Sequence, residues 1–250
     1  MISNRALLTL SVLAGAAAPA LAHAAYGPAG IAGVWESPWP QDEVRPPGSP
    51  PRPVEVTVPP LKEPYLQQWK DRQKAVAAAI ARGEPEVNNS VRCIPPGFPA
   101  MMAPGFPVEV LETPGQVTII NEAFSQVRRI YLGEKQLAVD DAEPYFFGHS
   151  VGHWEGDALV VDTVGVKTNV KMRDAPHSAN MKVDERLYPT SKTTFEDKVT
   201  VTDPEYLTGP WTWTWHYVRK PDYKINEFIC ENNREYADPT TGKEKVNLAP

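Results

Sequence analysis

Residues 147–163 have the sequence Phe147-Gly148-His149-Ser150-Val151-Gly152-His153-Trp154-Glu155-Gly156-Asp157-Ala158-Leu159-Val160-Val161-Asp162-Thr163. Two runs rich in β-branched and aromatic residues flank a short polar turn, which is typical of a β-hairpin. Either Glu155-Gly156 or Gly156-Asp157 supplies a two-residue turn. The stretch therefore predicts two antiparallel strands at the centre of a β-rich fold.

The side chains of this hairpin alternate between two faces of the sheet. His149, Val151 and His153 share one face. With either two-residue turn, Asp162 on the second strand joins the histidine face, whereas a three-residue loop would turn it away. The hairpin thus predicts a carboxylate close to two imidazoles, on the condition that the turn has two residues.

A carboxylate beside an imidazole fixes its tautomer and raises its basicity, as a general base requires. The alternative is a polar pair that only stabilises the hairpin. A metal site through His149 and His153 has weaker support, because four residues of a strand span about 13 Å unless a bulge intervenes. We therefore predict no metal and no cofactor at this site.

The chain beyond Pro107 continues in short β-rich runs separated by turn residues, which favours an antiparallel barrel over a sandwich. Gly33-Val34-Trp35 lies near the start of the mature chain, as in lipocalin-like proteins. We expect a lipocalin-like (calycin-like) barrel with its strands in a meander. The expected strands are 108–112, 116–122, 126–132, 145–154, 159–166, 181–188, 193–202, 211–218 and 224–230.

The region before the barrel is dominated by proline, of which the chain has 27 residues. Ten prolines between Pro38 and Pro64 predict an extended arm. Apolar residues at helical spacing predict one amphipathic helix over 64–82, and a loop follows at 100–107. We expect residues 25–107 to pack on a barrel of residues 108–250, so that 25–250 form one domain.

The first 24 residues have the features of a signal peptide: Arg5, an apolar run over 6–18 and small residues at the cleavage position. An uncleaved anchor is the alternative. We expect a periplasmic or secreted protein with no membrane span after cleavage, and the oligomeric state stays open. The formal net charge of -6 argues against a nucleic-acid partner.

Export changes the interpretation of the two cysteines. In an oxidising compartment, Cys93 and Cys230 are expected to form a disulfide. A nucleophilic cysteine is less favoured, because neither thiol has a histidine nearby in the sequence.

Several polar and aromatic side chains are predicted to line the barrel. Glu185 alternates with apolar residues, and a buried carboxylate needs a partner, for which Arg129 is the candidate. The alternative is a purely structural ion pair. Trp211, Trp213 and Trp215 form one face of a strand, either as core or as the wall of an aromatic pocket. His177 precedes a strand, where it either closes over the barrel mouth or stabilises a turn.

These motifs resemble a family of exported bacterial proteins with a Gly-His-Ser-x-Gly-x-Trp-Glu-Gly-Asp-x-Leu-Val-Val-Asp-Thr hairpin. Further shared stretches are Arg128-Arg129-Ile130-Tyr131, Pro176-His177-Ser178, Glu185-Arg186, Asp203-Pro204, Pro210-Trp211-Thr212 and the surroundings of Cys93 and Cys230. The resemblance implies export and kinship but transfers no reaction. The chain departs from the family pattern at 133–135 and at the basic stretch 167–173.

The pattern as a whole predicts a cofactor-free acid-base enzyme, a lyase or isomerase acting on an apolar or aromatic small molecule. His149 or His153 would take a proton, Asp162 would orient the base, and Arg129 and Tyr131 would stabilise negative charge, with Glu185 holding Arg129. The second hypothesis is a lipocalin-like binding or carrier protein without catalysis. A third, a metal-dependent oxidase or hydrolase that uses His149, His153 and His177, requires a bulged hairpin. We expect His149, His153 and Asp162 to face the barrel lumen together with Arg129 and Glu185. If Asp162 faces outward or tryptophans fill the lumen, the binding site is expected between the proline arm and the barrel near His177.

Overall fold

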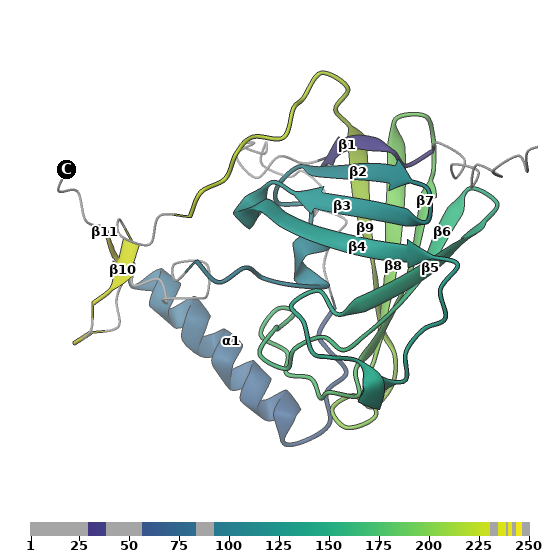
Figure 1. The fold of residues 1–250 in the computed structure, drawn as a ribbon. Coiled ribbons are helices and arrows are strands. Elements are labelled where there is room, and N and C mark those ends of the chain that lie inside the picture. Colours follow the sequence, from purple (N-terminus) through teal and green to yellow (C-terminus); the bar gives the residue numbers. More distant parts are fainter. Residues whose placement is uncertain are drawn as a thin grey trace, which may run out of the picture.

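The computed structural model describes residues 30–38, 57–83, 93–230, 235–238, 240–241 and 244–246. The predicted signal peptide and most of the proline arm lie outside these ranges. The described residues form a closed nine-strand barrel (Figure 1). Its strands are β1 (Gly33–Glu36), β2 (Val108–Thr113), β3 (Gln116–Asn121), β4 (Gln126–Leu132), β5 (His149–Glu155), β6 (Ala158–Val164), β7 (Lys182–Pro189), β8 (Thr194–Thr202) and β9 (Trp211–Arg219).

The strands follow one another around the barrel in sequence order, and β1 pairs with β9 to close it. The expected meander is wrong at one place, because β4 and β5 are parallel. Residues 133–148 carry the chain from one end of the barrel to the other between them. The strand expected at 224–230 is also absent from the described chain, since this stretch is irregular. The short β1 occupies the closing position instead.

The central hairpin has the second of the two registers that the sequence allowed. Glu155 pairs with Ala158, so Gly156-Asp157 is a two-residue turn, and Val151 lies opposite Asp162. The strands pair without a bulge. His149, His153 and Asp162 therefore share one face of the sheet, as predicted.

The barrel lumen is filled by the protein's own side chains. The tryptophan face of β9 points inward, and Trp211, Trp213 and Trp215 are all buried in the main hydrophobic core. Tyr217 continues this row and its ring stacks on Phe195 at 4.3 Å between centroids. The aromatic stripe is thus core, one of the two interpretations that the sequence offered.

The helix α1 (Tyr65–Ala81) confirms the predicted helix to within one residue at each end. It lies outside the barrel (Figure 1) and none of its residues is fully buried. Its first turns contact the barrel: the ring of Tyr65 packs on Tyr206 at 4.3 Å, and Trp69 donates its indole N–H to the carbonyl of Arg173 at 2.8 Å. No helix among the described residues is long and apolar enough to cross a membrane.

Smaller elements complete the described chain. Three short 3-10 helices are η2 (Ala100–Met102), η3 (Ala123–Ser125) and η4 (Val139–Asp141), and β10 (Glu235–Ala237) pairs with β11 (Glu244–Val246). The predicted disulfide is present between Cys93 and Cys230. It links the segment between β1 and β2 to the segment after β9, across 137 residues of sequence.

Candidate functional site

The buried carboxylate of the lumen has a different partner from the one predicted. Glu185 is paired with Arg128, whose Nη1 lies 2.9 Å from Oε1 of Glu185, and both side chains are fully buried. The Arg128 guanidinium also donates to the hydroxyls of Ser150 and Thr163. Arg129 is exposed on the opposite face of β4. The predicted Arg129–Glu185 pair is therefore wrong.

A second carboxyl group in the lumen was missed by sequence reasoning. Asp197 on β8 is fully buried, and neither of its carboxyl oxygens accepts a hydrogen bond from a donor among the described residues. Burial raises its pKa well above the usual value, and the negative charge of nearby Glu185 raises it further. Asp197 alternates with Phe195 and Val199, so the pattern that placed Glu185 inside would have found it.

The histidine face of the hairpin is the outer face of the barrel, which corrects the expectation that it lines the lumen. Ser150 and Thr163 point inward, whereas His149, His153 and Asp162 all lie on the other side of the sheet. On the inner face of β5, the hydroxyl of Ser150 lies 3.2 Å from Nε of Arg128 on the neighbouring strand. The predicted convergence of the histidines with Glu185 is therefore wrong.

Asp162 does not orient either histidine. His153 is exposed and its Nε2 lies 3.2 Å from Oε1 of Glu155 at the hairpin turn. Asp162 on β6 lies opposite Asp184 on β7. The pKa of Asp184 is raised by burial and then by the negative charge of Asp162. Oδ1 of Asp162 is buried without a partner among the described residues. The carboxylate–imidazole dyad expected at the hairpin is not formed.

Three of the five predicted catalytic residues nevertheless meet at one place. Arg129, Tyr131 and His149 line a surface hollow of about 360 Å³ between β4 and β5. We call it the β4–β5 hollow, and its other lining residues are Val127, Tyr145, Phe146, Phe147 and Gly148. Because β4 and β5 are parallel and adjacent, outward side chains of both strands contribute to one wall.

The polar side chains of the β4–β5 hollow are not committed to structural roles. The rings of Tyr131 and His149 stack at 5.6 Å between centroids with an interplanar angle of 25°. Within the described part of the chain, the Arg129 guanidinium, the Tyr131 hydroxyl and the ring nitrogens of His149 have no hydrogen-bond or ion-pair partner. A guanidinium, a phenol and an imidazole thus remain available to a bound molecule.

The start of β5 is fixed by a glycine beside the hollow. Gly148 has a φ of +62°, a left-handed conformation that side chains with a Cβ rarely adopt. A Cβ there would also lie 2.5 Å from the carbonyl oxygen of Val164. Close packing of this backbone against β6 sets the position of the adjacent His149. The Gln136 amide secures the same region, since it donates to the backbone carbonyls of His149 and Asp162.

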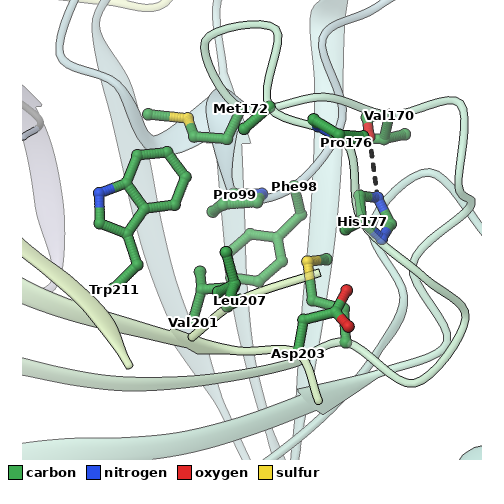
Figure 2. A pocket seen from close by; sticks show the side chains of 12 residues that line it. Phe98, Pro99, Val170, Met172, Pro176, His177, Val201, Asp203, Leu207 and Trp211 are labelled. Atoms are coloured by element: carbon green, nitrogen blue, oxygen red, sulfur yellow. Dashed lines mark hydrogen bonds between the residues drawn. The ribbon is translucent and has the colours of Figure 1, made fainter. Parts of the chain in front are cut away.

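A second, apolar pocket lies at the barrel mouth (Figure 2). Trp211 and His177 line it together with Phe98, Pro99, Val170, Met172, Ala175, Pro176, Met181, Val201, Asp203 and Leu207. The pocket lies near the site that we expected for a filled lumen, between the proline arm and the barrel. The arm is close by, because Trp211 donates its indole N–H to the carbonyl of Thr57 at the end of the arm. The space amounts to about 20 Å³, roughly that of one water molecule.

The polar groups around the mouth pocket are already engaged. Both ring nitrogens of His177 lie 2.8 Å from backbone carbonyls, those of Ser178 and Val170, and Figure 2 shows the second contact. Asp203 accepts hydrogen bonds from the backbone and side chain of Ser178. His177 therefore stabilises a turn, which was one of the two roles that the sequence allowed. What the mouth pocket offers a ligand is apolar contact.

The metal hypothesis requires a bulge in the hairpin, and β5 and β6 pair without one. His149 and His153 stand four residues apart on a regular strand, and His177 is held at the barrel mouth. In the described ranges, no group of three or more His, Cys, Asp or Glu side chains is arranged to hold a metal ion.

Comparisons with known proteins add no relative: no family model, curated protein or solved structure matched the chain. The resemblance to an exported bacterial family stays a prediction.

Proposed function

We propose that this protein binds a small aromatic molecule in the β4–β5 hollow. One observation supports the proposal above the others: three unpartnered polar side chains converge on a space walled by aromatic rings. Such a combination of apolar walls and a few placed polar groups is typical of small-molecule sites. The volume of about 360 Å³ lies within the usual range of such sites.

The lumen and the mouth pocket have less to offer a ligand, and two further surface hollows, of about 580 and 320 Å³, have no aromatic side chain in their linings. The lumen is filled by the tryptophan face of β9 and by the Arg128–Glu185 pair. The mouth pocket holds about one water molecule, and a larger guest has to displace side chains such as Met172. The binding function therefore sits on the outside of the barrel, in contrast to a carrier that encloses its ligand.

Fluorescence titration with the neutral probe 2-naphthamide tests this proposal. Tyr131→Ala and His149→Ala are each expected to weaken binding by about 10-fold or more, because both remove part of the stacked platform. His153→Ala is the matched control, since His153 lies on the same face of the same strand outside the hollow. Equal effects of His149→Ala and His153→Ala would contradict the proposal. A loss confined to Met172→Ala would place the site at the barrel mouth.

A second candidate function, an acid-base enzyme of the lyase or isomerase type, is favoured by the free ring nitrogens of His149. In this reaction His149 takes a proton from a carbon next to a carbonyl of the bound molecule. Arg129 and Tyr131 then hold the charge that develops on the carbonyl oxygen. The protein's own side chains supply the base and the charge stabilisation.

Deuterium exchange separates the enzyme from the binding protein. The benzylic protons of phenylpyruvate in D₂O are expected to exchange faster than in buffer alone, as measured by NMR. His149→Gln should return the rate to that of buffer, while His153→Gln should leave it unchanged. An unaccelerated rate with the wild-type protein would contradict the enzyme and leave the binding function standing.

We further propose that the barrel is lipocalin-like and that the protein works outside the cytoplasm. The sequential strand order supports the first point, as does Trp35 of the Gly-x-Trp motif, which packs under the Arg219 guanidinium at 4.1 Å. The Cys93–Cys230 disulfide supports the second, because such bonds persist in oxidising compartments. Non-reducing mass spectrometry of protein from its native compartment tests this placement, together with the predicted cleavage near residue 24.

A further inference from the structure

The charge of the β4–β5 hollow is unbalanced. Arg129 carries the one full charge among its lining residues, which include no aspartate or glutamate. The chain as a whole has a formal net charge of -6. A positive hollow on an acidic protein attracts an anion, and an anion would balance the Arg129 guanidinium.

Arg129 also differs from the other arginines of the described barrel strands. Arg128 is paired with Glu185, Arg186 is paired with Glu155 at 2.6 Å, and Arg219 donates to the backbone carbonyls of Gly30 and Ala32. Within that part of the chain, Arg129 alone has neither a carboxylate nor a carbonyl partner. Arg129 is exposed and lines the hollow, so its five N–H donors remain available to a ligand.

A second positive group, outside the lining of the hollow, lies close to one of its aromatic rings. The ammonium of Lys167 lies 5.5 Å from the centre of the Phe146 ring, which is itself a lining residue. Its charge adds to the positive potential around the space. The electrostatic preference for an anion therefore has two contributors from different segments of the chain.

The spacing of charge and rings defines the kind of anion. Arg129 and Tyr131 are two residues apart on β4 and point the same way, a separation of about 7 Å along the strand. This distance suits a one- or two-ring molecule that stacks near the Tyr131–His149 pair while its acidic group reaches Arg129. The planar guanidinium binds a planar carboxylate through two parallel hydrogen bonds.

From this geometry we infer that the ligand of the β4–β5 hollow is an aromatic carboxylate. The inference rests on the proposed binding function and specifies its ligand class. The carboxylate pairs with Arg129, and the rings lie against Tyr131 and His149.

The test compares 2-naphthoate with 2-naphthamide, its neutral counterpart of nearly equal shape. The wild-type protein is expected to bind naphthoate about 10-fold more tightly. Arg129→Gln should reduce this preference to within about 2-fold, because the exposed substitution removes the charge and keeps the fold. Added salt should weaken the binding of naphthoate alone, since the ion pair is solvent-accessible.

Lys198→Gln is the matched control. Lys198 is exposed on β8, outside the hollow, and its loss changes the net charge by the same amount as Arg129→Gln. The preference for naphthoate should survive this change. Equal affinities of the two probes, or a preference that Lys198→Gln and Arg129→Gln reduce alike, would overturn the inference while leaving aromatic binding in place. Failure of both probes to bind would overturn the proposed binding function as well.

Discussion

Arg128 and Glu185 form a bidentate ion pair inside the barrel, with both side chains withdrawn from solvent. Three further hydrogen bonds, two to the hydroxyl of Ser150 and one to that of Thr163, occupy the remaining side of the guanidinium. The face of Arg128 packs on the Phe98 ring at 3.8 Å. Residues from β4, β5, β6 and β7 thereby meet at one buried cation, which makes this pair a structural centre of the barrel.

We expect Arg128→Met to destabilise the fold by about 3–5 kcal/mol, because it leaves Glu185 buried without its counter-charge. Arg129→Met, one residue along on the exposed face, should change the unfolding free energy by about 0.5 kcal/mol or less. Urea denaturation monitored by tryptophan fluorescence measures both. The double variant Arg128→Met/Glu185→Leu should recover much of the loss, since no unpaired charge of this pair remains. Equal stability of the two single variants would refute the structural role of Arg128.

The same pair shows why the faces of the barrel could not be assigned from the sequence. In the sequence, Arg129 shares a strand face with Val127 and Tyr131, which favours an inward side chain, yet both of these residues line an outer hollow. Alternation predicts which residues share a face, and it did so correctly for His149 and Asp162. It does not say which face is buried. Here the buried charges of Arg128 and Glu185 neutralise each other inside the barrel, while aromatic side chains line a hollow on the outside.

Strand pairing was predictable where the connections are short and unpredictable elsewhere. The turn at Gly156-Asp157 fixes its hairpin locally. By contrast, the parallel β4–β5 pair depends on how residues 133–148 cross the barrel end, and closure by β1 depends on contacts with β2 and β9. The β4–β5 hollow lies on this parallel pair, so the antiparallel meander expected from the sequence did not predict it.

Asp197 is expected to make stability depend on pH. Its pKa in the folded protein is raised, first by burial and then by Glu185, whereas the unfolded chain ionises it near the usual value of about 3.9. The folded state therefore binds more protons than the unfolded state between these two pKa values. By linkage, the contribution of Asp197 to the free energy of unfolding falls as pH rises through that interval.

Asp197→Asn should remove this contribution, because the amide does not ionise. Chemical denaturation at several pH values above about 4 measures the effect as the difference between wild type and variant. The variant should become progressively more stable relative to wild type as pH increases. A difference that stays constant across this range would show that Asp197 ionises alike in both states.

The disulfide is expected to contribute substantially to stability. It closes a loop with a sequence separation of 137 residues, for which loss of chain entropy in the unfolded state predicts about 4–5 kcal/mol. The Cys93→Ser/Cys230→Ser variant should therefore be less stable by about 2–5 kcal/mol in thermal or urea unfolding. Peptide mapping without reductant should show the two cysteines linked. Two free thiols in protein from its native compartment would contradict the bond.

Two glycines with left-handed backbones allow strain and steric overlap to be measured separately. Gly148 has φ +62° and Gly156 has φ +61°, yet a Cβ at Gly156 meets nothing within 4 Å whereas one at Gly148 lies 2.5 Å from the Val164 carbonyl oxygen. Gly156→Ala should cost only the conformational strain, about 1–2 kcal/mol. Gly148→Ala should cost about 1–3 kcal/mol more, because β5 must shift away from β6. That shift moves His149, so 2-naphthamide binding should weaken in Gly148→Ala and persist in Gly156→Ala. Equal losses of stability and binding in the two variants would contradict the close packing that positions the hollow.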